Sequence, residues 1–364
     1  MKLSAIIAAL ETLAPPDLQE SYDNAGLITG NPEMEITGAL ICLDSIEAII
    51  DEAIRKKCNL VVAHHPIVFS GLKKITGKNY IERVIIKAIK NDIAIYAIHT
   101  NLDNVIHGVN RKIAEKLGLK NSRVLSEMAG NILKLVTYVP HAQAEQVMEA
   151  LFESGAGHIG NYSECCFKTE GSGTFKPGND ANPHIGEKNI RHTEPESCIE
   201  VILESRLKNK VLAALKAAHP YEEVAYEMYR LENKNQVTGA GMIGELQEAI
   251  PAEDFLKSLK VNMNTNCVRH TSHFGKTIKK VAVCGGAGSF LLGNAIAAGA
   301  DIFITGDFKY HQFFDADGKI IIADIGHFES EQHTIDLIGD WLREKFPTFA
   351  VHLTEINTNP INYI

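Results

Sequence analysis

The sequence predicts an α/β fold in which a duplicated core of layered sheets is interrupted by an inserted α+β segment. In the first and last thirds of the chain, apolar runs typical of buried strands alternate with amphipathic helical patterns, which favours parallel strand pairing. The first third also matches the last third when it is shifted along the sequence by 242 positions. The middle third has a different order of elements, and 364 residues are enough for two or three domains.

The first third is expected to contain three strands separated by two helices. The apolar runs lie at residues 38–43, 60–63 and 93–98, and the helical patterns lie at residues 45–57 and 80–91. The N-terminal residues 1–18 are amphipathic and carry Glu11. They therefore indicate a helix that ends at Pro15-Pro16 rather than a signal peptide.

The last third repeats this arrangement. Its expected strands lie at residues 280–284, 301–305 and 320–324, and its expected helices lie at residues 290–298 and 329–345. With the shift of 242 positions, residues 39–65 align with residues 281–307 without a gap. A second shift of 228 positions aligns His99 with His327 and Asp103 with Glu331. Because short βα units share apolar periodicity, a chance match is the alternative to a duplication.

The middle third is expected to form a separate inserted domain. Its strand-like runs lie at residues 132–139, 161–169, 198–203 and 223–231, and its helical patterns lie at residues 142–154 and 208–218. This order, βαββαβ, is the ferredoxin-like split motif. Residues 171–183 are rich in Gly, Pro and Asn and predict a loop, and residues 233–241 predict an exit linker. We therefore expect a first half of the core at residues 1–125, the inserted domain at 126–232 and a second half of the core at 233–364.

Two polar motifs lie where predicted strands of the first third end. His64-His65 precedes Pro66 at the carboxyl edge, where open parallel sheets place their ligands. His99 and Asp103 follow the next strand in the same way. Each motif also has an ordinary interpretation, as a chance histidine pair or as a carboxylate that caps a helix.

A third motif lies at the start of the last helix. His327 and Glu331 are four residues apart and would share one face of that helix, although a solvated pair is the alternative. If the duplicated strand ends face each other, three imidazoles and two carboxylates meet and can hold two divalent ions of zinc, iron or manganese. The expected ligands are His64, His65, Asp103, His327 and Glu331. His99 is expected to be either a sixth ligand or the catalytic proton-transfer group.

A glycine-rich turn at residues 285–289 follows a predicted strand and opens a helix. The backbone N–H groups of such a turn can bind an anion. The spacing matches neither the dinucleotide-binding pattern nor the P-loop pattern, so a tight turn needed only for packing is an equal alternative.

Together these motifs resemble those of the NIF-three-like proteins, which are catalogued as GTP cyclohydrolase I type 2 homologues. The resemblance runs from end to end of the chain and also rests on Asp23-Asn24-x-Gly26-Leu27, Gly285-Gly286-x-Gly288-Ser289 and Thr305-Gly306-Asp307. Tyr22 stands where members often carry tryptophan. The resemblance implies a dinuclear metal centre on the five residues named above and a toroidal homohexamer that encloses a central cavity.

The inserted segment resembles the middle domain of the long bacterial members, which is similar to PII and CutA proteins. Residues 155–162 and 219–223 carry this part of the resemblance. It implies an accessory domain that regulates the core or covers a pore. His158 and His219 are expected to have structural roles.

The expected function is binding of two divalent ions per chain, with hydrolysis of a small phosphorylated or nucleotide-like substrate as the favoured activity. The purine-reading pocket that GTP cyclohydrolase activity would need is not evident in the sequence. The alternative is a metal-storing or metal-sensing hexameric scaffold that has a regulatory inserted domain and no catalytic activity.

The composition indicates which kinds of partner the protein has and where in the cell it is found. The net charge of −9 argues against a surface that coats nucleic acid. No apolar run approaches the roughly 18 residues that a membrane span needs. Seven scattered cysteines without a C-x-x-C motif indicate reduced, buried thiols and a cytoplasmic protein.

Overall fold

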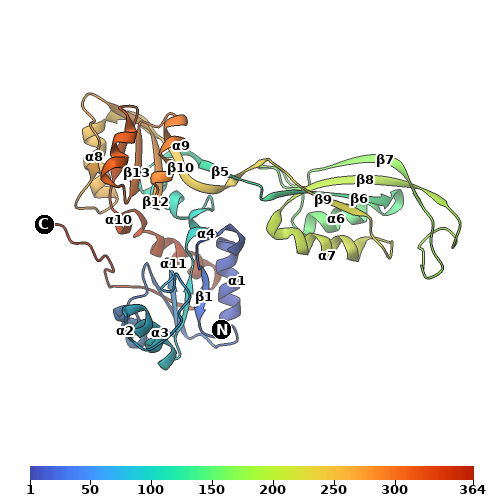
Figure 1. The fold of residues 1–364 in the computed structure, drawn as a ribbon, viewed down its shortest axis with the longest axis horizontal. Helices are drawn as coiled ribbons and strands as arrows, with labels where there is room; N and C mark the ends of the chain where they lie inside the picture. The colour runs from blue at the N-terminus through green and yellow to red at the C-terminus, as the bar shows by residue number, and fades with distance from the viewer. The chain divides into compact units, whose positions relative to one another are not determined.

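The computed structural model describes residues 1–364, which form two compact units (Figure 1). Unit 1 combines residues 1–127 with residues 237–364, and unit 2 consists of residues 128–236. The limits at residues 125 and 232 stay predictions of where an independent inserted domain would begin and end. No helix in the structure has both the length and the apolar character that crossing a membrane requires.

One sheet of unit 1 has five strands in the order β1-β4-β3-β2-β15. Its central strands β2 (Gly38–Cys42), β3 (Leu60–Ala63) and β4 (Ala94–Ala97) are parallel, and all of their residues are buried. β15 (Ala350–Leu353) pairs parallel to β2, and β1 (Gly26–Thr29) pairs antiparallel to β4. Because both faces of the central strands are covered, these strands read as continuous apolar runs in the sequence.

The other sheet of unit 1 has six strands in the order β11-β14-β13-β12-β10-β5. In sheet order these are Arg269–His270, Ile321–Asp324, Ile302–Gly306, Thr277–Ala287, Lys234–Pro251 and Lys120–Ala129. The three central strands are parallel, like those of the first sheet. In the first sheet Ala39 pairs with Leu60. Their counterparts 242 positions later, Val281 and Ile302, pair in the second sheet.

A single apolar cluster joins the inner faces of both sheets. Alternate strand residues such as Ile41 and Val62 in one sheet and Val283 and Ile304 in the other belong to it. The helices α1 (Leu3–Leu13), α5 (Val109–Lys116), α8 (Ala252–Asn262) and α11 (Thr334–Lys345) close this cluster. The outer faces are covered by α2 (Glu47–Arg55) and α3 (Tyr80–Lys90) on one sheet and by α9 (Leu292–Ala297) on the other. Each fully buried leucine or isoleucine contributes about 1.5–3 kcal/mol, so this packing fixes the strand ends in place.

Unit 2 contains one antiparallel sheet and two helices. Its elements in chain order are β6 (Ile132–Pro140), α6 (Ala144–Glu153), β7 (Cys166–Phe175), β8 (His192–Glu204), α7 (Lys208–Ala218) and β9 (Tyr226–Arg230). The sheet order is β7-β8-β6-β9, with all pairs antiparallel. Apolar residues of α6 and α7, such as Leu151 and Leu215, pack on one face of this sheet with Leu135 and Ile199.

Three sequence expectations are wrong in detail. Residues 329–345 do not form one helix, because α10 (His327–Glu331) is separate from α11. The Gln332 side chain donates to the carbonyl oxygen of Glu329, which residue 333 would use in a continuous helix. Residues 234–241, expected to be an irregular linker, belong to β10, and the boundary between the two units falls within them. β7 begins and ends later than expected and includes Gly171 and Gly173.

Candidate metal centre

His64 and His65 follow β3 at the carboxyl edge of the five-stranded sheet. Their backbone N–H groups donate to the carbonyl oxygens of Cys42 and Leu43 at 3.1 and 2.9 Å, so pairing with β2 continues past the end of the strand. This pairing sends the two side chains in different directions. His64 is fully buried, whereas 19% of the His65 side chain is exposed.

Asp103, His327 and Glu331 come from two short helices that also follow central strands. Asp103 is the last residue of α4 (Thr100–Asp103), which follows β4, and α10 follows β14. His327 and Glu331 lie one helical turn apart, and His327 Nε2 is 3.1 Å from Glu331 Oε2. Equivalent strand ends of the two sheets therefore supply the two groups of polar residues.

Glu331 connects the motifs. Its Oε2 lies 3.0 Å from His65 Nε2, and its Oε1 lies 3.8 Å from His64 Nε2. His64 Nε2 is also 3.7 Å from Asp103 Oδ1. One ligand atom each of His64, His65 and Glu331 falls within 4.8 Å of the other two, a spacing at which three ligands can share an ion. The structure thus brings all five predicted residues to one place, with this triad at the centre.

Two polar atoms in this cluster are buried and have no hydrogen-bond partner, His64 Nε2 and Asp103 Oδ1. A buried polar atom without a partner is unfavourable by about 1–3 kcal/mol. A divalent cation between these atoms would satisfy both, because imidazole nitrogens and carboxylate oxygens are ligands of zinc, iron and manganese. The residues present therefore fit a metal ion.

Each imidazole is oriented by an acceptor at its Nδ1 atom. The acceptors are the Ile98 carbonyl for His64 at 2.8 Å, Asp44 for His65 at 2.8 Å, Asp307 for His327 at 2.7 Å and Asp23 for His99 at 2.8 Å. An Nδ1–H donor leaves the Nε2 lone pair free to bind a metal, and a carboxylate partner raises the basicity of the ring.

The motifs did not identify Asp44, Asp307 and Asp23 as partners of the histidines. A signal for two of them is present in the sequence. Asp44 lies two residues after β2, and Asp307 lies directly after β13. Asp307 also aligns with His65 under the shift of 242 positions. A search for acidic residues at every equivalent strand end would have found both.

The histidines of the cluster differ in pKa because they differ in their hydrogen bonds to carboxylates. Burial lowers the pKa of His64. Burial also disfavours the charged form of His65, but hydrogen bonds with Asp44 and Glu331 outweigh it and raise the pKa of His65 to about 10. Burial acts against His327 in the same way, and its contact with Glu331 is the main cause that raises its pKa to about 9.

The two carboxylates of the cluster are pushed in opposite directions. Burial would raise the pKa of Glu331, but its contacts with His327, His64 and His65 outweigh it and lower that pKa well below its usual value. Burial, together with the neighbouring negative charge of Glu331, raises the pKa of Asp103 well above its usual value. The ionised form of Asp103 is therefore unfavourable at this position, and a cation beside the carboxylate would stabilise it.

The glycine-rich turn packs against the cluster and does not offer these N–H groups to an anion. The N–H groups of three glycines already donate to side-chain oxygens, Gly285 to Asn110, Gly286 to Ser330 and Gly288 to Thr305. Gly286 has a φ of 62°, and a Cβ atom there would overlap the Glu331 carboxylate. Of the two expectations for this turn, packing is the one that the contacts support.

His99 lies beside the cluster. Its ring centroid is 5.4 Å from those of His64 and His65, and Phe69 packs edge-on against it at 5.6 Å. Asp23 fixes the ring through Nδ1 and is itself held by the Thr100 hydroxyl at 2.5 Å. The position of His99 is compatible with both roles expected for it, a sixth ligand and a proton-transfer group.

The cluster opens into a cavity of about 790 Å³ within unit 1. Tyr22, Phe69 and Phe290 contribute aromatic side chains to its wall, and the C-terminal residues 359–361 also border it. The hydroxyl of Thr358 donates to Asp44 Oδ2 at 2.6 Å, which ties the C-terminal segment to the residue that orients His65. No lysine or arginine lines this cavity.

The sequence pattern of the Duf34/NIF3 (NGG1p interacting factor 3) family matches residues 1–360. The chain belongs to the Duf34/NIF3 family. A Halalkalibacterium halodurans protein called GTP cyclohydrolase 1 type 2 homolog is 40% identical over 365 residues, which cover 99% of this chain and 98% of that protein. A Bacillus subtilis protein of the same name is 37% identical over 365 residues, with coverage of 99% and 98%.

Two solved structures match over the whole chain. A Bacillus cereus protein related to NIF3 has a TM-score of 0.87 and 37% identity, covering 100% of this chain and 99% of that one. A Staphylococcus aureus protein has a TM-score of 0.80 and 30% identity, with the same coverage. The expected relation to the NIF-three-like proteins is thereby confirmed. The likeness of unit 2 to PII and CutA proteins stays a prediction.

Proposed function

We propose that this Duf34/NIF3 protein holds two divalent ions of zinc, iron or manganese and hydrolyses a small phosphorylated or nucleotide-like substrate. The proposed ligands are His64, His65, Asp103, His327 and Glu331. The observation that carries the proposal is the pair of buried, unpartnered atoms, His64 Nε2 and Asp103 Oδ1, beside a carboxylate that contacts three imidazoles.

The two oxygens of Glu331 support a site for two ions rather than one. Oε1 lies on the side of His64, and Oε2 lies on the side of His65 and His327. A carboxylate with a different set of neighbours at each oxygen would be able to contribute to the binding of two cations. In that arrangement Asp103 would share one ion with His64.

When bound, such ions lower the pKa of a water molecule and stabilise negative charge on the reacting group. The chain itself supplies orientation, through the contacts of Asp44 with His65 and of Asp307 with His327. His99 is the proposed proton-transfer group, because Asp23 fixes its ring at the border of the cluster.

The cavity of about 790 Å³ has the size of a small-molecule site. Because no lysine or arginine lines it, a phosphate group of the substrate would have to bind to the ions. The name of the relatives refers to GTP cyclohydrolase, and we do not extend that activity to this chain, because only that name points to it.

The same lack of basic side chains favours a second candidate function. A metal-storing or metal-sensing scaffold without catalytic activity needs the ligand cluster but no group that recognises an anionic substrate. In this alternative, unit 2 would be the regulatory part. We further propose that unit 2 is a ferredoxin-like domain resembling PII and CutA proteins, and that the cytoplasmic protein assembles as a homohexamer.

Metal analysis of the purified protein, followed by activity assays, tests the two candidates. We expect about two ions per chain after loading with manganese, iron or zinc, and turnover of at least one member of a panel of phosphoesters and cyclic amidines. His64→Ala and Glu331→Gln should abolish both metal binding and turnover, whereas the exposed control Glu344→Gln should change neither. Tight metal binding without turnover of any compound would favour the scaffold, and failure to bind metal would overturn both candidates.

A further inference from the structure

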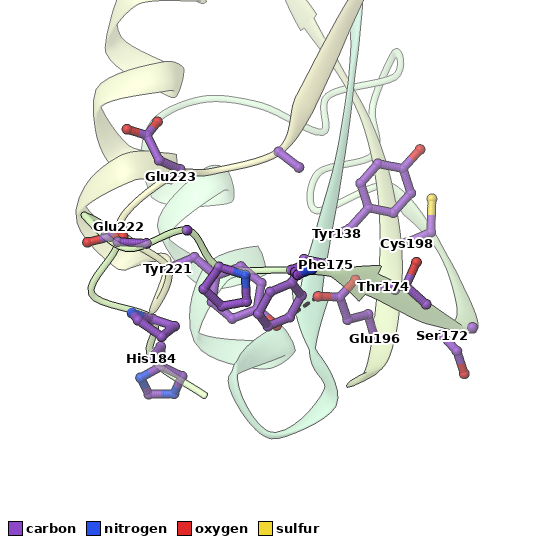
Figure 2. A pocket seen from close by; sticks show the side chains of 18 of the residues that line it. Tyr138, Ser172, Thr174, Phe175, His184, Glu196, Cys198, Tyr221, Glu222 and Glu223 are labelled. Carbon is purple, nitrogen blue, oxygen red and sulfur yellow. Dashed lines mark hydrogen bonds between the residues drawn. The ribbon is translucent and has the colours of Figure 1, made fainter. Parts of the chain in front are cut away.

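Unit 2 has a cavity of its own, of about 770 Å³, and every residue that lines it belongs to unit 2 (Figure 2). The end of β7, the segment that follows it and residues 221–225 form its walls. Its ligand class can be inferred from two features of these walls, their aromatic side chains and their charge.

The aromatic part of the wall surrounds Tyr221. The ring centroid of Tyr221 is 5.8 Å from that of Phe175 and 6.3 Å from that of His184. Figure 2 shows Phe175 and Tyr221 close together at the carboxylate of Glu196. Aromatic faces grouped around a carboxylate are the features that recognise an organic cation.

Glu196 is the buried carboxylate of this wall, and only 8% of the residue is exposed. Its Oε1 accepts a hydrogen bond from the Tyr221 hydroxyl at 2.8 Å, while no protein group donates to its Oε2. A Cβ atom at Gly173 would overlap Oε2. Because Gly173 has no side chain, there is room for Glu196 Oε2. This oxygen has no protein donor and is available to a ligand.

The turn that carries Tyr221 is fixed by a buried histidine. His219 Nε2 donates to the Tyr138 carbonyl oxygen at 2.9 Å, and the backbone N–H of Tyr221 donates to His219 Nδ1 at 3.1 Å. Burial lowers the pKa of His219, which favours the neutral tautomer that makes both contacts. His219 is thus a structural residue, and it holds the Tyr221 ring at the cavity.

The charge around the cavity is predominantly negative. Four carboxylates line it, from Glu170, Glu196, Glu222 and Glu223, against the single ammonium group of Lys176. A concave site with this imbalance attracts cations and repels phosphate-bearing ligands.

We propose that this cavity of unit 2 binds a small organic cation that carries a guanidinium or alkylammonium group. The cationic group pairs with Glu196 Oε2, and its carbon atoms lie against the rings of Phe175 and Tyr221. The charge-assisted hydrogen bond gives the affinity, and the aromatic walls select organic cations over hydrated metal ions. The cavity is separate from the metal centre, so binding does not depend on the proposed function of unit 1.

Calorimetric titration of the full-length, metal-chelated protein tests this inference. The probes are agmatine, putrescine and n-butylamine, each of which carries a cationic N–H donor, with ATP as an anionic comparison. We expect one-to-one binding of at least one of the three cations and no competition by ATP. Glu196→Gln should weaken that binding about tenfold or more, because a charged hydrogen bond is lost while the size of the side chain is kept.

Three further variants separate recognition from folding. Gly173→Ala should weaken binding by displacing Glu196, and Phe175→Leu should weaken it about threefold to tenfold by removing a cation–π contact. Glu149→Gln, a change of the same type at an exposed site on α6, should leave the affinity unchanged. Unchanged thermal melting would show that each variant folds. Absence of binding by all three cations at millimolar concentration, equal affinity in Glu196→Gln and wild type, or displacement of the cation by ATP would each overturn the proposal.

Discussion

Glu331 Oε2 lies 3.0 Å from His65 Nε2, although 266 positions separate the two residues in the sequence. The contact joins the last residue of α10 to the segment that follows β3, and so it joins corresponding edges of the two sheets of unit 1. It also explains the perturbed protonation of the cluster, because a single buried carboxylate is shared by several imidazoles.

Removing the charge of Glu331 should return the pKa values of His65 and His327 toward that of an unperturbed histidine. In metal-free Glu331→Gln we expect the pKa values of His65 and His327 to fall from about 10 and about 9 toward about 6.5. NMR titration of the histidine rings in chelated protein measures this change, with Glu344→Gln as the control. Wild-type pKa values retained in Glu331→Gln would contradict the contact.

The same shifts predict how the stability of the metal-free protein depends on pH. A histidine whose pKa is raised on folding stabilises the native state fully below its unfolded value of about 6.5. That contribution is lost as the pH rises through about 9 and about 10. Urea unfolding between pH 6 and pH 10 should therefore show a larger decline in stability for wild type than for Glu331→Gln, and parallel curves would refute the assignment.

The carboxylates of Asp44 and Asp307, which accept hydrogen bonds from two of the proposed histidine ligands, should affect metal affinity without binding metal themselves. Asp44→Asn and Asp307→Asn keep the size of the side chain but weaken the hold on His65 and His327. We expect each variant to lower metal affinity about 10- to 100-fold, as is typical for partners of ligating histidines. Competition with a metal-binding dye measures the change. Asp315→Asn, at an exposed position with no such contact, should bind like wild type.

Two glycines provide a matched test of the turn that packs against Glu331. Gly286→Ala forces a side chain into the left-handed region, which costs about 1–2 kcal/mol, and displaces the Glu331 carboxylate. We expect weaker metal binding as well as lower stability. Gly293→Ala places the same methyl group in open space on α9, where alanine favours the helix, so stability and metal binding should be kept or slightly improved. Equal behaviour of the two variants would argue against the packing role of the turn.

The C-terminal segment should act on the metal centre through Thr358. Its hydroxyl donates to Asp44, which in turn orients His65. Thr358→Val should therefore weaken metal binding, by less than the roughly tenfold minimum expected for Asp44→Asn. Thr358→Ser retains the hydroxyl and should restore the wild-type affinity. If serine and valine give the same result, the hydrogen bond has no part in positioning the histidine.

The sequence was informative where local chemistry determines structure. The central strands could be predicted because continuous apolar runs of four to six residues end abruptly in polar residues, as at Ala63 and His64. The pairing of His327 with Glu331 follows from helical periodicity alone. The meeting of these two motifs required a further inference, the equivalence of the two strand sets, and the matching register of β2–β3 and β12–β13 agrees with it.

Features that depend on tertiary contacts could not be predicted. At the break after α10 the Gln332 side chain donates to the carbonyl oxygens of Glu329 and of Met263, and no local pattern encodes the contact with the distant Met263. β10 has two glycines with positive φ in a segment that resembles a linker, yet it pairs within the six-stranded sheet. β7 extends through Gly173 because it pairs with β8 along its whole length, and glycine at this position leaves room for the Glu196 carboxylate of the neighbouring strand.

The proposed ligands come from two distant parts of the sequence of unit 1, and this has a consequence for biosynthesis. His64, His65 and Asp103 leave the ribosome before unit 2 has been made, whereas His327 and Glu331 emerge only after it. During that interval the nascent chain offers two imidazoles and one carboxylate without the glutamate that contacts both imidazoles. Loading of the proposed site with metal is therefore expected to follow synthesis, and an ion captured earlier would have to be released or rearranged when α10 docks.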